Sequence, residues 1–362
     1  MLSLALFFIV LGVLVLVHEL GHFLAAKRVG VRVERFSFGF GPKLFSVKRG
    51  ETEYMISLVP LGGYVKMAGD EPGEALKGHK WEFLSRSVSD RFGIIFAGPL
   101  LNYILAFLIF SVIFMFGSPT ITTEIGALMD GYPAKDGGIL AGDKVVAIDG
   151  KAVKYWEEMT ELIHKHVDGP MRVSIERNGH LFEKEIMPVV RKTKDIFGSE
   201  VKLALIGVAP SIEKIEKVRY NPLLSLYMGA KKLWSLTRVT YRALWSMATG
   251  RMSLKDSVTG PIGIFMITGE VAKMGLVYLL NLIGILSASL AIFNVLPLPV
   301  LDGGHIFFLG LEKIMGRPLS QKTQEFIANV GWGFIILLMV FIFYSDIVKF
   351  GIIEKVIKVF RK

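Results

Sequence analysis

Four long apolar stretches constrain this chain more than any other feature of its sequence. They run over Leu2 to Ala26, Phe92 to Ile121, Met274 to Leu301 and Phe326 to Ser345, and the last three contain no Asp, Glu, Lys or Arg. A helix needs roughly 20 apolar residues to cross about 30 Å of hydrocarbon, so each stretch can span a bilayer. Because 52% of all residues are hydrophobic, we predict a multi-pass α-helical membrane protein with four transmembrane helices, at about 2–26, 92–117, 274–301 and 326–345.

The charged residues indicate a membrane surface rather than a nucleic acid as partner. The formal net charge is +10, but the 42 basic residues are dispersed among 32 acidic ones. Lys27, Arg28, Arg32 and Arg35 follow the first apolar stretch, and nothing basic precedes it. The positive-inside rule then places the N-terminus outside and the end of this helix at the cytoplasmic side of the membrane. We expect the helix to be retained, because it lacks the basic region and cleavage pattern of a signal peptide.

The first apolar stretch contains a pattern typical of metal chemistry, His18-Glu19-Leu20-Gly21-His22. On a helix, four residues advance about 6 Å and roughly one turn, so both imidazoles face the same way. Glu19 lies beside them and could take a proton from water at the metal, as in the HExxH zinc hydrolases. Ionisable residues at membrane depth are seldom kept without a function. Because the chain has no cysteine, we predict Zn²⁺ held by nitrogen and oxygen ligands.

A catalytic zinc site needs a third protein ligand. The third apolar stretch ends in Asn294-Val295-Leu296-Pro297-Leu298-Pro299-Val300-Leu301-Asp302-Gly303-Gly304-His305. Two prolines and two glycines beside an acid at membrane depth interrupt a helix and expose backbone polar groups to a cavity. Asp302 could supply a carboxylate oxygen and His305, one turn on, an imidazole nitrogen. Spacing alone leaves both candidates open.

Between the first two apolar stretches, residues 31–66 contain short strand-like segments separated by turns. We expect a small antiparallel sheet on the cytoplasmic side. Because it directly follows the metal motif, the segment with Tyr54, Ile56 and Leu58 could be an edge that pairs with an unwound substrate strand. The alternative is that the sheet only caps the membrane part.

Residues 118–210 have about as many acidic as basic residues and predict a soluble α+β domain. The turn Ala141-Gly142-Asp143, followed by Ile148-Asp149-Gly150, resembles a PDZ domain of the circularly permuted bacterial type. Such domains bind peptide ends or strands in a groove between a strand and a helix, which we expect at Ile121 to Met129 and Trp156 to His166. Since one membrane crossing precedes it, the domain should be extracytoplasmic.

The stretch 211–273 is expected to form amphipathic interfacial helices on the outer leaflet, because basic residues are interspersed with aromatic and aliphatic ones. The basic residues include Lys231, Lys232, Arg238 and Arg242. Within this stretch, Thr259 to Ile267 is apolar but too short to span, which indicates a hydrophobic anchor or a re-entrant piece.

Three motifs in this order resemble the site-2 protease family of intramembrane metalloproteases. They are the histidine motif, Gly98-Pro99-Leu100-Leu101-Asn102 in the second stretch, and Asn294 to Gly304 in the third. The resemblance covers nearly the whole chain, with a membrane catalytic core at 1–117 and 274–362. It implies that zinc binds His18, His22 and Asp302, that Glu19 is the catalytic base, and that Asn294 and Asn102 contact the substrate backbone. From its residue type alone, Asn102 could equally join two helices.

The resemblance also implies a substrate class. It predicts regulated intramembrane proteolysis of single-span membrane proteins, such as anti-sigma factors or remnant signal peptides, with a peptide or protein ligand at the PDZ groove. One departure is the single PDZ domain, where many proteobacterial relatives have two. Two other function classes fit less well. A membrane-anchored PDZ scaffold has no use for Glu19 beside the ligands, and a secondary transporter would show an inverted repeat.

Overall fold

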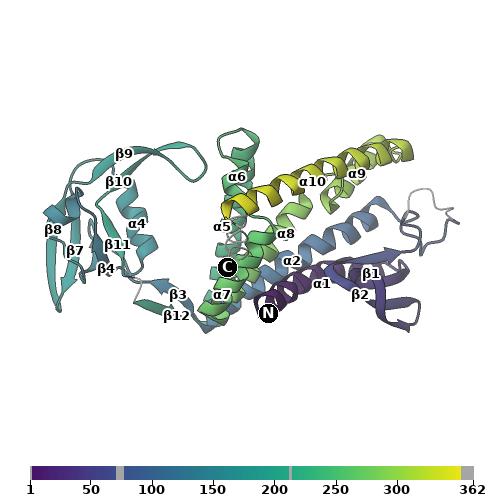
Figure 1. Cartoon of the computed structure of the whole chain (residues 1–362), viewed down its shortest axis with the longest axis horizontal. Helices are drawn as coiled ribbons and strands as arrows, with labels where there is room; N and C mark the ends of the chain where they lie inside the picture. The colour runs from purple at the N-terminus through teal and green to yellow at the C-terminus, as the bar shows by residue number, and fades with distance from the viewer. Residues whose placement is uncertain (1, 71–76, 212–213, 352–362) are drawn as a thin grey trace, which may run out of the picture. The chain divides into compact units, whose positions relative to one another are not determined.

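The chain folds as two compact units in a computed structural model that describes residues 2–70, 77–211 and 214–351 (Figure 1). The membrane unit comprises Met1–Val112, Leu226–Tyr241 and Ser253–Lys362, and the inserted unit comprises Ile113–Ser225 and Arg242–Met252. Small parts of the predicted domains lie outside the described residues, namely 1 and 71–76 of the first core segment, 212–213 of the interfacial stretch and 352–362 of the second core segment.

Four helices in the described residues are long and apolar enough to cross a membrane, as predicted. They are α1 (Leu2–Arg28), α2 (Val88–Phe116), α8 (Leu276–Val295) and α10 (Gln321–Lys349). The third predicted span, 274–301, was too long at both ends. Gly275 breaks the chain with a φ of 116°, and Pro297 and Pro299 prevent the helix from continuing.

The strands β1 (Val33–Arg49) and β2 (Thr52–Met67) form the predicted small sheet. Each strand contributes two segments, because β1 pairs with two separate parts of β2. Arg35 to Phe38 pair with Glu53 to Ile56 and also with Gly63 to Lys66, while Lys43 to Arg49 pair with Thr52 to Ser57. The segment at Glu53 to Ile56 is therefore internal, and the segments at Lys43 to Arg49 and Gly63 to Met67 are the two edges.

The helices α1 and α2 cross so closely that glycine is required at the contact. A Cβ on Gly21 would lie 2.2 Å from the carbonyl oxygen of Ala97, and a Cβ on Gly98 would lie 2.3 Å from Nε2 of His22. The sheet also packs on α1, since a Cβ on Gly12 would lie 2.8 Å from the ring of Phe38. Small residues at such crossings allow two helix backbones to approach each other.

The C-terminal part of the membrane unit contains two shorter helices, α7 (Pro261–Met274) and α9 (Asp302–Met315). The buried carboxylate of Asp346 on α10 accepts hydrogen bonds from the backbone N–H groups of Gly260 and Gly263, at 3.0 and 2.9 Å, and so caps α7. A mostly buried ion pair between Arg91 of α2 and Glu312 joins α9 to α2. The apolar piece predicted at Thr259 to Ile267 is thus the start of a helix that is tied to α10.

In the inserted unit, helix α4 (Trp156–Lys165) packs with a four-stranded antiparallel sheet. Its order is β6 (Lys151–Ala152), β5 (Lys144–Ile148), β7 (Met171–Arg177) and β8 (His180–Ile186). Side chains from the sheet and α4, among them Val145, Val173, Ile175 and Met159, form one buried core. This is the PDZ-like α+β region that the sequence predicted.

Three two-stranded ladders, one long helix and two short helices complete the described part of the chain. The ladders pair β3 (Ser118–Ile121) with β12 (Ile215–Val218), β4 (Ile125–Leu128) with β11 (Val208–Pro210), and β9 (Val189–Lys194) with β10 (Glu200–Leu205). The helices are α3 (Pro133–Asp136), α5 (Pro222–Ala248) and α6 (Leu254–Ser257).

The pairing of β3 with β12 corrects the predicted domain boundary at residue 210. The inserted unit extends beyond it because β12, which had been assigned to the interfacial helices of 211–273, is a strand of this unit. A short strand without strict alternation cannot be distinguished from a connecting segment until its partner is known.

The Ala141-Gly142-Asp143 turn has a clear structural role in this unit. Asp143 is 1% exposed and accepts hydrogen bonds from both Nε and Nη2 of Arg177, at 2.6 and 2.7 Å, and from the Leu140 backbone N–H at 2.8 Å. Burial alone would raise the pKa of Asp143, but these hydrogen bonds lower it below its usual value. The ionised carboxylate thus holds β7 to the turn before β5.

We expect Asp143→Asn to loosen the inserted unit selectively. Loss of the charge leaves Arg177 partly buried without its counter-ion, so amide exchange in β5 and β7 should accelerate roughly tenfold or more, as measured by hydrogen-exchange mass spectrometry of the whole protein. Because the folded pKa of Asp143 is depressed, its contribution is present above about pH 4 and is lost as the pH falls further, in the wild type only. Asp130→Asn, at an exposed ion pair with Lys135, is the matched control. Equal exchange in both variants would contradict this role.

Candidate metal centre

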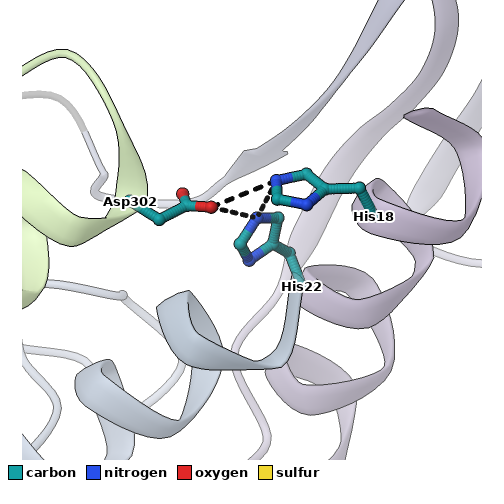
Figure 2. Close-up of side chains that lie close together, drawn as sticks. All are labelled: His18, His22 and Asp302. Carbon is teal, nitrogen blue, oxygen red and sulfur yellow. Dashed lines mark hydrogen bonds and ion pairs between the residues drawn. The ribbon is translucent and has the colours of Figure 1, made fainter. Parts of the chain in front are cut away.

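Three potential ligand atoms converge between α1 and the start of α9 (Figure 2). His18 and His22 lie one turn apart on α1, and their Nε2 atoms are 3.2 Å from each other. Oδ2 of Asp302 is 3.1 Å from Nε2 of His18 and 3.6 Å from Nε2 of His22. Both imidazoles are buried, at 8% and 9% exposure. Of the two candidates that the sequence left open for the third ligand, Asp302 is the one that joins the histidines.

These separations fit a tetrahedral metal ion. Ligands about 2.0–2.1 Å from a zinc ion at tetrahedral angles lie about 3.3–3.4 Å apart, which is within the range of the three distances. Oδ2 of Asp302 is buried, and among the described residues it makes no contact with hydrogen-bond geometry. A buried carboxylate oxygen without a donor needs a cation. The donor set of two imidazoles and one carboxylate is the set found in catalytic zinc sites that keep a fourth position open.

The second nitrogen of His22 determines which tautomer faces the cluster. Its Nδ1 donates a hydrogen bond to the carbonyl oxygen of Ile94 on α2, at 2.9 Å. A neutral imidazole that donates from Nδ1 has a lone pair on Nε2, which is the form that binds a metal. The close crossing of α1 and α2 therefore prepares His22 as a ligand.

Asp302 reaches the histidines because the chain turns sharply before α9. A Cβ on Gly303 would lie 2.1 Å from the carbonyl oxygen of Leu296, and a Cβ on Gly304 would lie 2.4 Å from that of Leu298. The first turn of α9 thus packs directly on the backbone of the proline-containing loop. Any side chain at these two glycines would push Asp302 away from α1.

Two other predicted site residues lie next to the cluster. Glu19 is half-buried and lies close enough to His18, His22 and Asp302 to interact with them electrostatically. On its other side, Glu19 Cγ lies 3.1 Å from where a Cβ on Gly63 would be. Nδ2 of Asn294 is 3.5 Å from Nε2 of His18. A carboxylate and an amide thus lie next to the three potential ligands.

His305 and Asn102 are placed differently from these residues. The side chain of His305 is exposed, and it supplies no atom to the cluster formed by the described residues. Asn102 is completely buried within the helix packing. Its backbone oxygen accepts a hydrogen bond from the hydroxyl of Ser287 on α8, at 2.7 Å. The Asn102 side chain is therefore enclosed in the helix packing, and its backbone oxygen links α2 to α8.

The edge predicted at Tyr54, Ile56 and Leu58 does not match the pairing of the sheet. Tyr54 and Ile56 belong to the segment that is paired on both sides, and the Tyr54 ring packs on Phe23 of α1. The edge beside the cluster is Gly63 to Met67, since Gly63 contacts Glu19. Sequence reasoning missed this edge because one long strand that pairs twice looks the same as two separate hairpins.

The inserted unit has its own groove, with a cavity of about 160 Å³ along α4. Trp156, Met159 and Ile163 of α4 line one side, and residues 205–208 line the other. The predicted strand at Ile121 to Met129 contributes Met129, but β4 lies on the far edge of the ladder and pairs with β11. The groove is therefore formed by α4 and the segment that leads into β11.

Comparisons with known proteins agree with this site. The model of Peptidase family M50 matches residues 6–338. The chain is 32% identical to Zinc metalloprotease RasP of Geobacillus kaustophilus, over 95% of this chain and 97% of the relative. It is 30% identical to Regulator of sigma E protease of Salmonella typhi, over 95% of this chain and 98% of the relative.

These matches extend over both units. They favour a metalloprotease over the two other function classes considered from the sequence, a PDZ scaffold and a secondary transporter. The candidate cluster of histidines and Asp302 lies inside the matched range. The chain therefore belongs to peptidase family M50, the site-2 proteases, and is an intramembrane zinc metalloprotease, as its three motifs predicted.

Proposed function

We propose that this protease cleaves the transmembrane segments of single-span membrane proteins, with zinc held by His18, His22 and Asp302. The observation that carries the proposal is the convergence of three ligand atoms within 4.8 Å, from helices far apart in the sequence, beside Glu19 and Asn294. When bound, zinc is a Lewis acid that acidifies water and polarises a carbonyl group.

The residues around the ligands divide the remaining work. Glu19 accepts a proton from the attacking water and returns it to the leaving amine, which needs a carboxylate within reach of both. Asn294 donates from Nδ2 toward the substrate backbone next to His18. Both groups are attached to helices, so they keep their positions while the substrate enters.

A transmembrane substrate must unwind before it can be cut, because its carbonyls are hydrogen-bonded within the helix. The sheet edge at Gly63 to Met67 offers new backbone partners to an unwound strand directly beside Glu19. An apolar cavity of about 200 Å³ is lined by Pro99, Leu100, Ala291 and Val295, of which Pro99 and Val295 are the chain neighbours of Gly98 and Asn294. This lining suits the aliphatic side chains of a membrane segment.

Charge supports an orientation with the metal centre toward the cytoplasm. Lys27 and Arg28 end α1 and Arg32 follows it, while Arg86 precedes α2 and Arg91 lies in its first turn. The ion pair of Arg91 with Glu312 places the basic end of α9 at the same side. By the positive-inside rule this side is cytoplasmic, and the inserted unit, one crossing later, is extracytoplasmic. There its groove along α4 would bind a peptide or protein segment.

Glu19→Gln tests the assignment of the catalytic base. The amide keeps the size of the side chain but cannot accept a proton, so cleavage of a reconstituted single-span substrate should fall by at least about a hundredfold. Zinc content, measured by elemental analysis of the same preparation, should stay at the wild-type level. Undiminished cleavage would reject Glu19 as the base.

The third ligand is tested by comparing Asp302→Asn with His305→Ala. We expect the first variant to lose tightly bound zinc, because an amide oxygen lacks the charge that balances the metal. The second should keep its zinc, since the His305 side chain lies outside the cluster. Zinc content after dialysis against a chelator measures both. Loss in the His305 variant alone would reverse the assignment.

The substrate-binding edge is testable because the chain has no cysteine. We expect Tyr64→Cys, on the edge, to form a disulfide with a single cysteine placed near the scissile bond of a substrate, in the Glu19→Gln background. Tyr54→Cys, on the internal segment, is the matched control and should cross-link several-fold less. Gel mobility under non-reducing conditions reads out the product. Equal cross-linking at both positions would remove the preference for this edge.

A further inference from the structure

The two imidazoles of the metal centre differ at the nitrogen that faces away from the ligand cluster. Nδ1 of His22 donates to the Ile94 carbonyl oxygen. Nδ1 of His18 is equally buried, but it has no hydrogen-bond partner among the described residues. His18 can offer a lone pair from Nε2 in the neutral form only if Nδ1 carries the hydrogen. A buried N–H group then needs an acceptor, and metal-binding histidines almost always have one.

A second buried group near this position also lacks partners. The Asn102 side chain is 0% exposed, and neither its Oδ1 nor its Nδ2 has a hydrogen-bond partner in the part of the chain that the structure describes. Only its backbone oxygen is used, by Ser287. A buried amide with an unpaired acceptor and two unpaired donors is unfavourable unless a polar molecule joins it.

The geometry of the helix crossing brings these two groups toward each other. Gly98 of α2 lies beside both His18 and His22, whereas Ile94 lies beside His22 and shares a buried cluster with Ala26 nearer the end of α1, so α1 and α2 run in opposite directions. Asn102 lies one turn beyond Gly98 on the same face of α2. A Cβ on Gly98 would be 3.0 Å from Cε1 of His18, the ring carbon bonded to Nδ1.

Side-chain direction strengthens this placement. Helical side chains lean toward the N-terminus of their own helix and cover the preceding turn. Asn102 therefore leans back toward Gly98, and His18 leans toward the start of α1, which is the direction in which Asn102 lies. These directions bring the two unpaired groups toward each other, and they do not hydrogen-bond to each other directly.

We propose that one internal water molecule links His18 to Asn102, an inference that rests on the proposed role of His18 as a zinc ligand. The imidazole Nδ1–H donates to the water, and the water donates to Oδ1 of Asn102. This link holds the ring with its Nε2 lone pair toward His22 and Asp302, as the Ile94 carbonyl does for the other imidazole. Asn102 is thus a positioning residue for the metal centre and makes no contact with the substrate.

The test is the zinc affinity of the full-length protein, measured in detergent by competition with a fluorescent chelator. Asn102→Leu keeps the side-chain size but removes both hydrogen-bonding groups, and we expect zinc to bind about 10- to 100-fold more weakly. Asn102→Asp keeps an acceptor and should bind zinc within about threefold of the wild type. The cobalt-loaded Leu variant should show shifted visible absorption bands, whereas the Asp variant should not.

Ser287→Ala is the matched control, because it removes a hydrogen bond from α8 to the backbone of the same residue. It should leave the zinc affinity unchanged. Wild-type affinity in Asn102→Leu, or an equal loss in Ser287→Ala, would overturn the inference. If Asn102→Leu does not fold, the nitrogen-15 spectrum of the zinc-loaded wild type decides. A His18 Nδ1–H with a cross-peak to bound water supports the link, and the absence of that cross-peak refutes it.

The readout also separates this inference from the proposed function. Zinc affinity does not depend on cleavage, so a protein that binds zinc as expected but cuts no membrane segment would refute the proposed substrate class alone. Failure of Asn102→Leu to alter zinc binding would refute the water link alone.

Discussion

The close crossing of α1 and α2 is the contact on which the metal centre depends. Gly21 and Gly98 leave no room for a Cβ between the helices, and only at this separation can His22 reach the Ile94 carbonyl oxygen. A side chain at either glycine would separate the helices and push against the imidazoles. The hydrogen bond that selects the ligand tautomer would then be lost. In a bilayer, where hydrophobic burial does not drive helices together, this packing has to come from shape and hydrogen bonds.

Asp302, the proposed third ligand, imposes a complementary requirement, a backbone that stops being helical at membrane depth. Unpaired backbone groups are unfavourable in hydrocarbon, so such a break persists only where protein or a cavity surrounds it. Here the loop of Leu296 to Leu301 packs against Gly303 and Gly304, and the ion pair of Arg91 with Glu312 holds the far part of α9 to α2. The break and its supports together place Asp302 opposite the histidines.

Much of this arrangement could be predicted from the sequence, because the decisive signals are local. Four apolar stretches gave the spans, helical periodicity placed His18, Glu19 and His22 together, and the prolines beside Asp302 marked the break. The sequence could not reveal features that depend on partners distant in the chain. Because β1 pairs with two parts of β2, the segment with Tyr54 is internal and the free edge lies at Gly63. In the same way, β12 belongs to the inserted unit because it pairs with β3. The isolation of Asn102 likewise emerges only when the surrounding helices are in place.

The ladder of β3 and β12 has a consequence for how this architecture can change over evolution. The first strand of the inserted unit, β3, begins directly after α2, and it pairs with the last strand of the unit, β12. The two ends of the inserted unit are therefore adjacent. Additional domains can be inserted between them without changing the distance between the helices before and after the unit. The alignment with the Salmonella protein is 447 positions long, whereas this chain has 362 residues. An insertion site with adjacent ends can accommodate such differences in size. The membrane unit can then remain constant in evolution while the inserted unit changes in size.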